Sequence, residues 1–232
     1  MDSLPHFDRI ERKSTTEIVY EHLKESILDG SLTPGTRLVE AQIAEQMGIS
    51  RSPVREALRL LEADRLIETE SGRGTSVKRL SAEEIWEVYT ARQLIEGYVA
   101  ALAAQRATPA DVSGLEAALE KVLALAEAED YSGTVKADFE IHRLIWEASG
   151  HRLLCDILSR LDVQIRMFMA VQAPMFDHLY DSVEDHQRII QAIAEGDAAA
   201  ARESVEMHIL AAGRLAVDRL ERESEEVQPV AA

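Results

Sequence analysis

The sequence predicts a mainly α-helical protein in two parts, a winged helix-turn-helix followed by an all-α antiparallel helical bundle. Two observations predict the first part: helical patterns flank a tight turn at "MGISRS", and two short β-like arms surround "SGRG". One observation predicts the second part: after residue 80, apolar residues recur at helical spacing in about six segments with short loops between them. Short connections favour antiparallel neighbours, so these segments are expected to form a bundle.

The expected order along the chain is a loose arm (1–13), the winged helix-turn-helix (14–79), the helical domain (80–223) and a polar tail (224–232). The single cysteine, Cys155, excludes an internal disulfide and fits a reducing compartment. The first residues lack the apolar core of a signal peptide, and no apolar run reaches the roughly 18 residues of a membrane span. We therefore expect a cytoplasmic protein without a membrane-spanning segment.

The net charge of −17 argues at first against a nucleic-acid partner, but this charge is unevenly distributed. Residues 1–80 carry 12 Lys and Arg against 14 Asp and Glu, whereas residues 81–232 carry 13 against 28. Salt screens charges beyond about 8–10 Å at cellular ionic strength. An acidic second domain therefore does not prevent a nearly neutral first domain from binding DNA through a local basic face.

The first part contains three predicted helices and a hairpin. The first helix begins at the Ser-Thr-Thr run 14–16 and stops at Gly30. A short helix ends at Gly48, and the third begins at Ser50, a favourable N-cap residue. Two β-like arms around the turn 71–74 form the hairpin. Helix, short helix, tight turn, helix and hairpin is the order of a winged helix-turn-helix.

Three arginines of this part are candidate contacts to double-stranded DNA. Arg51 and Arg55 lie one helical turn apart on the third helix, away from its apolar stripe. In a helix-turn-helix the N-terminal end of this helix enters the major groove, where arginine can bind guanine or phosphate. Arg73 lies at the hairpin tip, where a phosphate or minor-groove contact is possible. A small helical domain with surface arginines is the alternative at this point.

The stretch "PGTRLVEAQIAEQMGISRSPVREALRLLEADRLIETESGRGTSV" resembles the DNA-binding domain of the GntR transcriptional regulators. Its run "SRSPVREAL", followed by "LLE" and "RLI", is highly specific to that family. The resemblance implies operator contacts by the residues at the family's contact positions, which are Arg51, Ser52, Arg55, Ser71 and Gly72. One position departs from the best-described fatty-acid regulator of the family, which has an arginine contact where Ala41 stands here. A different base preference is therefore expected.

Four side chains of the helical part are candidate metal ligands. Asp138 and His142 lie one turn apart on one helix face, and His186 and His208 each fall on the apolar side of a later helix. Any one of these histidines is more simply a buried, hydrogen-bonded imidazole. A shared metal ion would satisfy all of them at once, and facing helices of a bundle are a common place for such a site. His151 and His178 are instead expected at the surface.

The segments "ARQLIEGYVAALAA", "DFEIHRLIWEASG" and "DHQRIIQAIAEGDAAAARESVEMHI" resemble the all-helical FCD effector domain of the FadR branch of GntR regulators. The resemblance implies that Asp138, His142, His186 and His208 occupy the four ligand positions of the metal-binding members. His151 departs from the usual asparagine in the turn after "ASG". One carboxylate and three imidazoles suit a divalent Zn, Ni, Mn or Fe ion, of which we favour Zn²⁺.

An octahedral metal with four protein ligands leaves two positions that a small organic-acid effector could fill. Arg92 is the predicted clamp for its carboxylate, since arginine binds carboxylates through two parallel hydrogen bonds. Arg143 and Arg166 are weaker candidates, because each could simply pair with a surface acid.

The predicted function is that of a transcription regulator. The resemblance to GntR regulators implies a repressor, because repression is the usual mode of control in that family. As a homodimer it would place two recognition helices about one DNA turn apart on a palindromic operator. Effector binding would favour a geometry that no longer matches that spacing. Two alternatives are a DNA-binding regulator with a purely structural metal, and a metal-dependent enzyme fused to a DNA-binding domain. A candidate base at catalytic spacing is missing from the sequence pattern, so we predict a protein that is not an enzyme.

Overall fold

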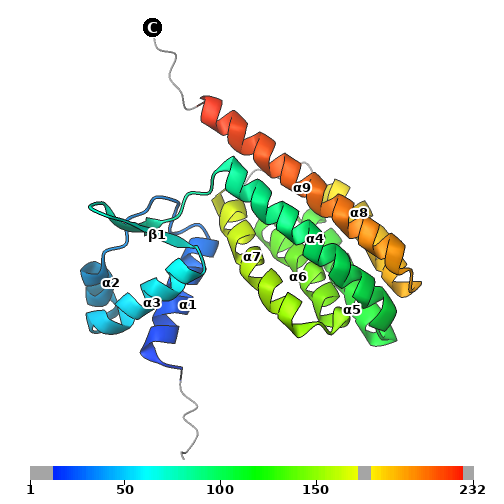
Figure 1. Ribbon diagram of the computed structural model, residues 1–232, viewed down its shortest axis with the longest axis horizontal. Coiled ribbons are helices and arrows are strands. Elements are labelled where there is room, and N and C mark those ends of the chain that lie inside the picture. Colours follow the sequence, from blue (N-terminus) through cyan, green and yellow to red (C-terminus); the bar gives the residue numbers. More distant parts are fainter. Residues whose placement is uncertain (1–12, 172–178, 227–232) are drawn as a thin grey trace, which may run out of the picture. The chain divides into compact units, whose positions relative to one another are not determined.

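The computed structural model describes residues 13–171 and 179–226. The chain divides into two compact units, Met1–Lys78 and Arg79–Ala232 (Figure 1). The first unit carries three helices and a small two-stranded wing, and the second is built from helices alone in its described part. The predicted fold class is therefore confirmed. The predicted N-terminal arm and His178 lie outside the described residues, as does most of the predicted tail.

The first unit begins with α1 (Thr15–Leu28), α2 (Glu40–Met47) and α3 (Arg51–Ala63). Ser14 caps α1, because its hydroxyl accepts a hydrogen bond from the Glu17 N–H while the Glu17 carboxylate accepts one from the Ser14 N–H. Gly48 ends α2 with φ +65°, a left-handed conformation that glycine adopts without strain and that turns the chain into α3. Ser50 occupies the N-cap of α3 as predicted, but its side chain makes no capping hydrogen bond.

The wing is a hairpin of β1 (Ile67–Glu70) and β2 (Gly74–Val77), which pair antiparallel with Ile67 opposite Val77. Both of these end residues are buried, whereas the tip of the hairpin is exposed. The buried residues join the core of the unit, to which α1 and α3 contribute an apolar stripe each. This core contains Val19, Leu23, Ile27, Val54, Leu58, Leu61 and Leu66. Burial of the stripe on α3 leaves the opposite face of that helix, with its arginines, in solvent.

The second unit contains α4 (Ala82–Arg106), α5 (Pro109–Glu127), α6 (Tyr131–Ser149), α7 (Arg152–Val171), α8 (Leu179–Ala194) and α9 (Ala198–Glu226). Capping boxes form at the starts of α4, between Ser81 and Glu84, and of α5, between Thr108 and Asp111. Ser182 is of a residue type favoured as a helix N-cap, but α8 begins at Leu179, so Ser182 lies inside the helix. Within the described residues, none of the helices combines the length and apolar character needed to cross a membrane.

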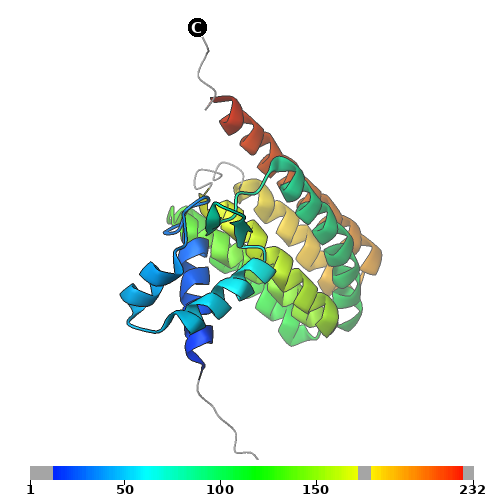
Figure 2. The same cartoon turned by 60° about the vertical axis from the view of Figure 1, so that its left-hand side comes forward.

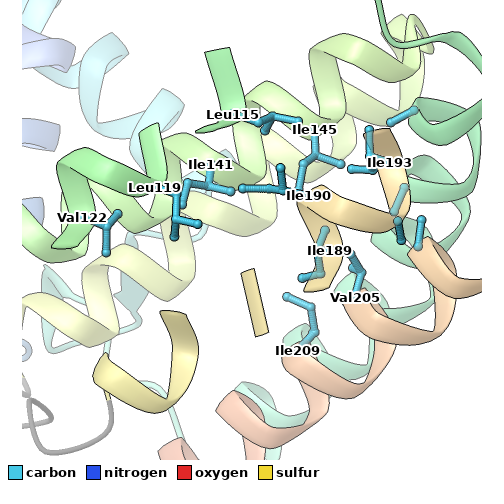
Figure 3. Close-up of a cluster of buried hydrophobic side chains, with 14 of the residues drawn as sticks. Leu115, Leu119, Val122, Ile141, Ile145, Ile189, Ile190, Ile193, Val205 and Ile209 are labelled. Carbon is cyan, nitrogen blue, oxygen red and sulfur yellow. The ribbon is translucent and has the colours of Figure 1, made fainter. Parts of the chain in front are cut away.

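The most extensive helix pair of this unit is α4 with α9, which lie side by side in both views (Figures 1 and 2). Gly213 allows this close approach, because a Cβ built there would lie only 2.8 Å from the Cβ of Tyr89. Figure 3 shows the adjoining apolar core, in which Ile141 and Ile145 of α6 and Ile189 and Ile190 of α8 meet residues of α5 and α9. Polar side chains that point inward from these helices are therefore surrounded by close-packed apolar residues, which restrict their movement.

Candidate metal centre and DNA-reading surface

Three histidines from three helices meet in the second unit. His142 comes from α6, His186 from α8 and His208 from α9, and all three are buried. The ring centre of His142 lies 5.2 Å from that of His186 and 5.2 Å from that of His208. The ring centres of His186 and His208 lie 4.5 Å apart. One nitrogen from each ring lies within 4.8 Å of the others. The packing of α6, α8 and α9 thus gathers the three imidazoles that the sequence singled out.

The spacing of the facing nitrogens suits a transition-metal ion. Nε2 of His142 lies 3.3 Å from Nε2 of His208. Two nitrogens bound at about 2.0–2.1 Å to one tetrahedral Zn²⁺ would lie roughly 3.4 Å apart. Imidazole nitrogens are also among the commonest ligands of Zn, Ni and Fe ions. The donor set therefore fits a divalent cation of this kind.

Asp138 lies beside the histidine cluster, one turn before His142 on α6. Its Oδ1 is 3.6 Å from Nδ1 of His186, and this buried oxygen accepts no hydrogen bond within the described part of the chain. Burial alone would raise the pKa of Asp138, but the nearby histidines lower it below its usual value. Asp138 is thus a charged oxygen donor at the edge of the cluster, next to it but outside the compact group of three nitrogens.

Glu96 on α4 is a central residue that the sequence reasoning missed. Its Oε1 accepts a hydrogen bond from Arg92 Nε at 2.6 Å, and its Oε2 faces His142 Nδ1 at 2.9 Å and Trp146 Nε1 at 3.1 Å. Burial alone would raise the pKa of Glu96, but Arg92 and His142 bring it down to about 2. A charged carboxylate only accepts hydrogen bonds, so His142 donates from Nδ1 and presents Nε2 to the cluster.

A second carboxylate plays the same part for His208. Nδ1 of His208 lies 3.4 Å from Oδ2 of Asp185 on α8, and this contact lowers the pKa of Asp185. Two of the three histidines therefore have a carboxylate on Nδ1, an arrangement that orients the other ring nitrogen toward a metal and raises its basicity. The sequence carried a signal for Glu96, an Arg and a Glu four apart on an otherwise apolar helix face, "RQLIE".

Arg92, the predicted effector clamp, is only 3% exposed. Its guanidinium carbon lies 5.7 Å from the ring centre of Tyr89 and 6.0 Å from that of Phe139. Nε binds Glu96, whereas the buried Nη2 has no hydrogen-bond partner in the described residues. A buried N–H without an acceptor is unfavourable by about 1–3 kcal/mol, so this atom marks a place for an anionic or carbonyl oxygen.

The other two predicted effector arginines differ from Arg92. Arg143 is a correction: it lies on the exposed face of α6 and pairs with Glu140 and Glu147, so it does not reach the histidine cluster. It faces outward because it follows the inward-facing His142 by one residue, about 100° around the helix. Arg166 on α7 is half-buried and lies near Asp162. Burial raises the pKa of Asp162 to about 6, although Arg92 and Arg166 oppose this shift.

All six predicted DNA contacts lie on the exposed surface of the first unit, on α3 and at the wing tip. They are Arg51, Ser52, Arg55, Ser71, Gly72 and Arg73. Two of them already have acidic partners. Arg55 donates from Nε and Nη2 to the Glu40 carboxylate, each at 2.9 Å, and Arg73 pairs with Glu70 at 3.0 Å. Arg37, which the sequence reasoning did not single out, donates to the Arg73 carbonyl and so ties the wing to the preceding loop.

A winged helix-turn-helix joined to a separate all-helical unit defines the chain as a DNA-binding transcription regulator. The family model described as "Bacterial regulatory proteins, gntR family" matches residues 15–77, and that of the FCD domain matches residues 87–211. The chain therefore belongs to the GntR family, and its FCD domain fits the FadR-type subfamily.

Individual relatives agree with this assignment. The chain is 33% identical over 210 residues to the Uxu operon regulator of Haemophilus influenzae, covering 81% of this chain and 76% of that protein. It is 29% identical to a protein of Paenarthrobacter nicotinovorans named "Probable D-xylose utilization operon transcriptional repressor", covering 88% and 89%. A crystal structure of a GntR regulator from Rhodococcus sp. RHA1 superimposes with a TM-score of 0.76 at 26% identity, covering 89% of this chain and 99% of that one.

Proposed function

We propose that this transcription regulator is a homodimeric repressor whose operator affinity is controlled by a small carboxylate bound at a metal centre. The single observation that carries the proposal is the buried cluster of His142, His186 and His208. In two of these histidines, His142 and His208, Nδ1 lies within hydrogen-bond distance of a carboxylate oxygen. Buried histidines oriented in this way are typical of metal ligands. His142, His186 and His208 would hold the ion, with Asp138 supplying an oxygen, and Zn²⁺ is the ion we favour.

The proposed effector site adjoins the cluster. When bound, the metal supplies positive charge to which a small organic acid is attracted. Arg92 supplies a second cation, because its buried Nη2 needs an acceptor and an arginine–carboxylate pair is strong and directional. Arg166 and Asp162, both half-buried, are further candidates on α7 for contacts to polar groups of the effector.

DNA binding is proposed for the exposed end of α3 and the wing tip, through the six residues named above. The Arg55–Glu40 pair competes with this role only weakly, since an exposed ion pair contributes only about 0–1 kcal/mol and a phosphate or guanine can replace the carboxylate. The relative from Paenarthrobacter carries "repressor" in its name. Repression is accordingly the direction of control that we propose for this chain.

A homodimer is supported by an apolar face on the second unit. Leu94 and Tyr98 of α4 and Leu153 and Ile157 of α7 are large, apolar and exposed. The two pairs adjoin, because the Tyr98 ring lies 6.5 Å edge-on from the ring of His151, just before α7. Arg152, Asp156 and Arg160 lie at four-residue spacing along the same helix and are exposed. Exposed apolar side chains gathered on one face mark an interaction surface, and a second copy of the chain is the occupant we propose.

One experiment separates this proposal from its main rival, a regulator with a purely structural metal. Purified full-length protein would be loaded with Zn²⁺, and an operator selected from randomised duplex DNA would be titrated by fluorescence anisotropy with and without a panel of small organic acids. A carboxylate that weakens operator binding supports a sensor. Enclosure of the histidines within the bundle favours the structural metal, which predicts that metal is present and no acid alters operator affinity.

A further inference from the structure

Glu96 links two parts of the candidate site that lie on different helices. One oxygen binds Arg92, the proposed effector clamp on its own helix, and the other binds His142, a proposed metal ligand on α6. We infer that Glu96 is a positioning residue that holds His142 in the Nδ1–H tautomer, with Nε2 presented to the histidine cluster, and that Arg92 holds Glu96 in place for this task. The proposed function supplies the identity of the bound ion, whereas the tautomer itself follows from the contacts.

The proton assignment follows from the chemistry of the two groups. A neutral imidazole has one N–H and one lone pair, and a metal binds only through the lone pair. The Glu96 carboxylate faces a guanidinium at 2.6 Å and is therefore charged and accepts only. Nδ1 of His142 must then carry the hydrogen, which leaves the lone pair on Nε2. That nitrogen lies 3.3 Å from Nε2 of His208, where an ion shared by the two rings would bind.

The carboxylate is itself fixed by its surroundings. Glu96 is only 2% exposed, and Trp146 donates a third hydrogen bond to it from the indole Nε1 at 3.1 Å. Arg92 lies against the rings of Tyr89 and Phe139, so the guanidinium is held by packing as well as by Glu96. A buried carboxylate with three donors has little freedom to rotate away from His142.

The substitution Glu96→Gln tests this role with almost no change of shape. Two groups that only donate face position 96, the Arg92 guanidinium at 2.6 Å and the Trp146 indole at 3.1 Å, and we expect the amide oxygen of glutamine to keep the shorter, charged contact to Arg92. Its NH₂ group then faces His142 and donates to Nδ1, which moves the imidazole hydrogen to Nε2. The substitution is therefore expected to convert His142 from a metal ligand to a hydrogen-bond donor at the cluster. Trp146→Phe is the matched control, because it removes one donor to Glu96 and leaves the Arg92 and His142 contacts in place.

The first measurement uses the metal-free, full-length protein at about pH 8, above the ordinary histidine pKa. Long-range ¹H–¹⁵N NMR spectra report which ring nitrogen carries the hydrogen, and comparison with His142→Gln identifies the His142 signals. We expect the Nδ1–H form in the wild type and in Trp146→Phe, and the Nε2–H form in Glu96→Gln. An Nε2–H form in the wild type overturns the inference, even if Glu96→Gln fails to fold.

The second measurement is Zn²⁺ affinity by competition with a chelator. We expect Glu96→Gln to bind Zn²⁺ about 10–100-fold more weakly than the wild type, and Trp146→Phe to remain close to it. Equal affinity in wild type and Glu96→Gln overturns the inference while leaving the metal centre itself standing. If the wild type binds no Zn²⁺, the proposed function fails, and the NMR spectrum still decides the role of Glu96.

Discussion

Arg55 and Glu40 form a two-pronged ion pair from α3 to α2, with Nε and Nη2 of the arginine each 2.9 Å from a carboxylate oxygen. Arg55 is a proposed operator contact, so Glu40 competes with DNA for the same guanidinium. We expect Arg55→Ala to weaken specific operator binding by about 1–3 kcal/mol. Glu40→Gln should strengthen it, because it frees the guanidinium and removes a negative charge near the phosphates. Anisotropy titrations measure both.

The control for this pair is Arg59→Ala. Arg59 is an exposed arginine of the same helix, paired with Glu56 one turn earlier, and is not among the proposed contacts. Its substitution should change operator affinity far less than Arg55→Ala. Unchanged operator affinity in Arg55→Ala would show that Arg55 does not contribute to DNA binding.

His186→Ala is expected to lower the metal content of the purified protein. His186 is fully buried within the cluster, and its loss leaves two imidazoles and the Asp138 carboxylate, one ligand fewer than the four of a structural zinc site. Elemental analysis by mass spectrometry measures the metal per chain. His151→Ala is the control, since His151 caps the start of α7 and lies outside the three-histidine group. Full occupancy in His186→Ala would exclude it as a ligand.

Removal of the metal should destabilise the second unit, because an ion that binds only the folded state adds to its stability. An ion present at 100 times its dissociation constant contributes about 2.7 kcal/mol. Thermal unfolding with and without a chelator, followed by circular dichroism, measures the change. In His186→Ala the same chelator should have little effect, and an equal drop in both proteins would show that the chelator acts elsewhere.

Gly213→Ala and Gly114→Ala should shift stability in opposite directions. A Cβ at Gly213 would lie 2.8 Å from Tyr89 Cβ and Cγ, so we expect a loss of about 1–3 kcal/mol from overpacking between α4 and α9. A Cβ at Gly114 in α5 would meet nothing within 4 Å, so alanine there should stabilise the helix by roughly 0.5–1 kcal/mol. Urea unfolding of each variant measures the free energy. A harmless Gly213→Ala would show that the two helices can separate freely.

Asp162→Asn should stabilise the metal-free protein increasingly as the pH rises. Burial raises the pKa of Asp162 from 3.8 to about 6, so its contribution to stability is complete below about pH 3.8 and is lost as the pH rises through about 6. Asparagine does not titrate. The difference in unfolding free energy should therefore grow by up to about 3 kcal/mol between pH 4 and 7. A flat curve for Asp162→Asn would contradict the raised pKa of its carboxyl group in the folded protein.

The double variant Leu94→Asp, Leu153→Asp should convert the proposed dimer to a monomer, because it places two charges on each apolar face. Analytical ultracentrifugation gives the mass in solution. Met207→Asp is the control, since Met207 is also a large exposed apolar residue but lies on α9, where it lines a pocket with Asp185 and Arg188 of α8. A double variant that stays dimeric would move the interface elsewhere.

Local patterns predicted the helices and the wing well, because their signals lie within a few residues of one another. The capping boxes at Ser81 and Thr108 and the glycine at 48 act on the adjoining turn alone. Ser182 shows the limit of such signals: a good cap residue lies inside α8, where the helix continues through it. Helical spacing likewise indicated the inward side of His142, His186 and His208, but it could not indicate what faces them.

By itself the sequence determined which residues form helices, which faces of those helices are apolar, and where side chains with metal-ligating or DNA-contacting groups lie on those helices, since these depend on neighbours along the chain. Only the tertiary structure decided which side chains pair across helices: His142 with Glu96, His208 with Asp185, and Arg55 with Glu40. It also decided that Arg143 lies in solvent. The physical reason is that a hydrogen bond acts over about 3 Å. Whether two side chains come that close is decided by how the helices pack, which no local pattern specifies.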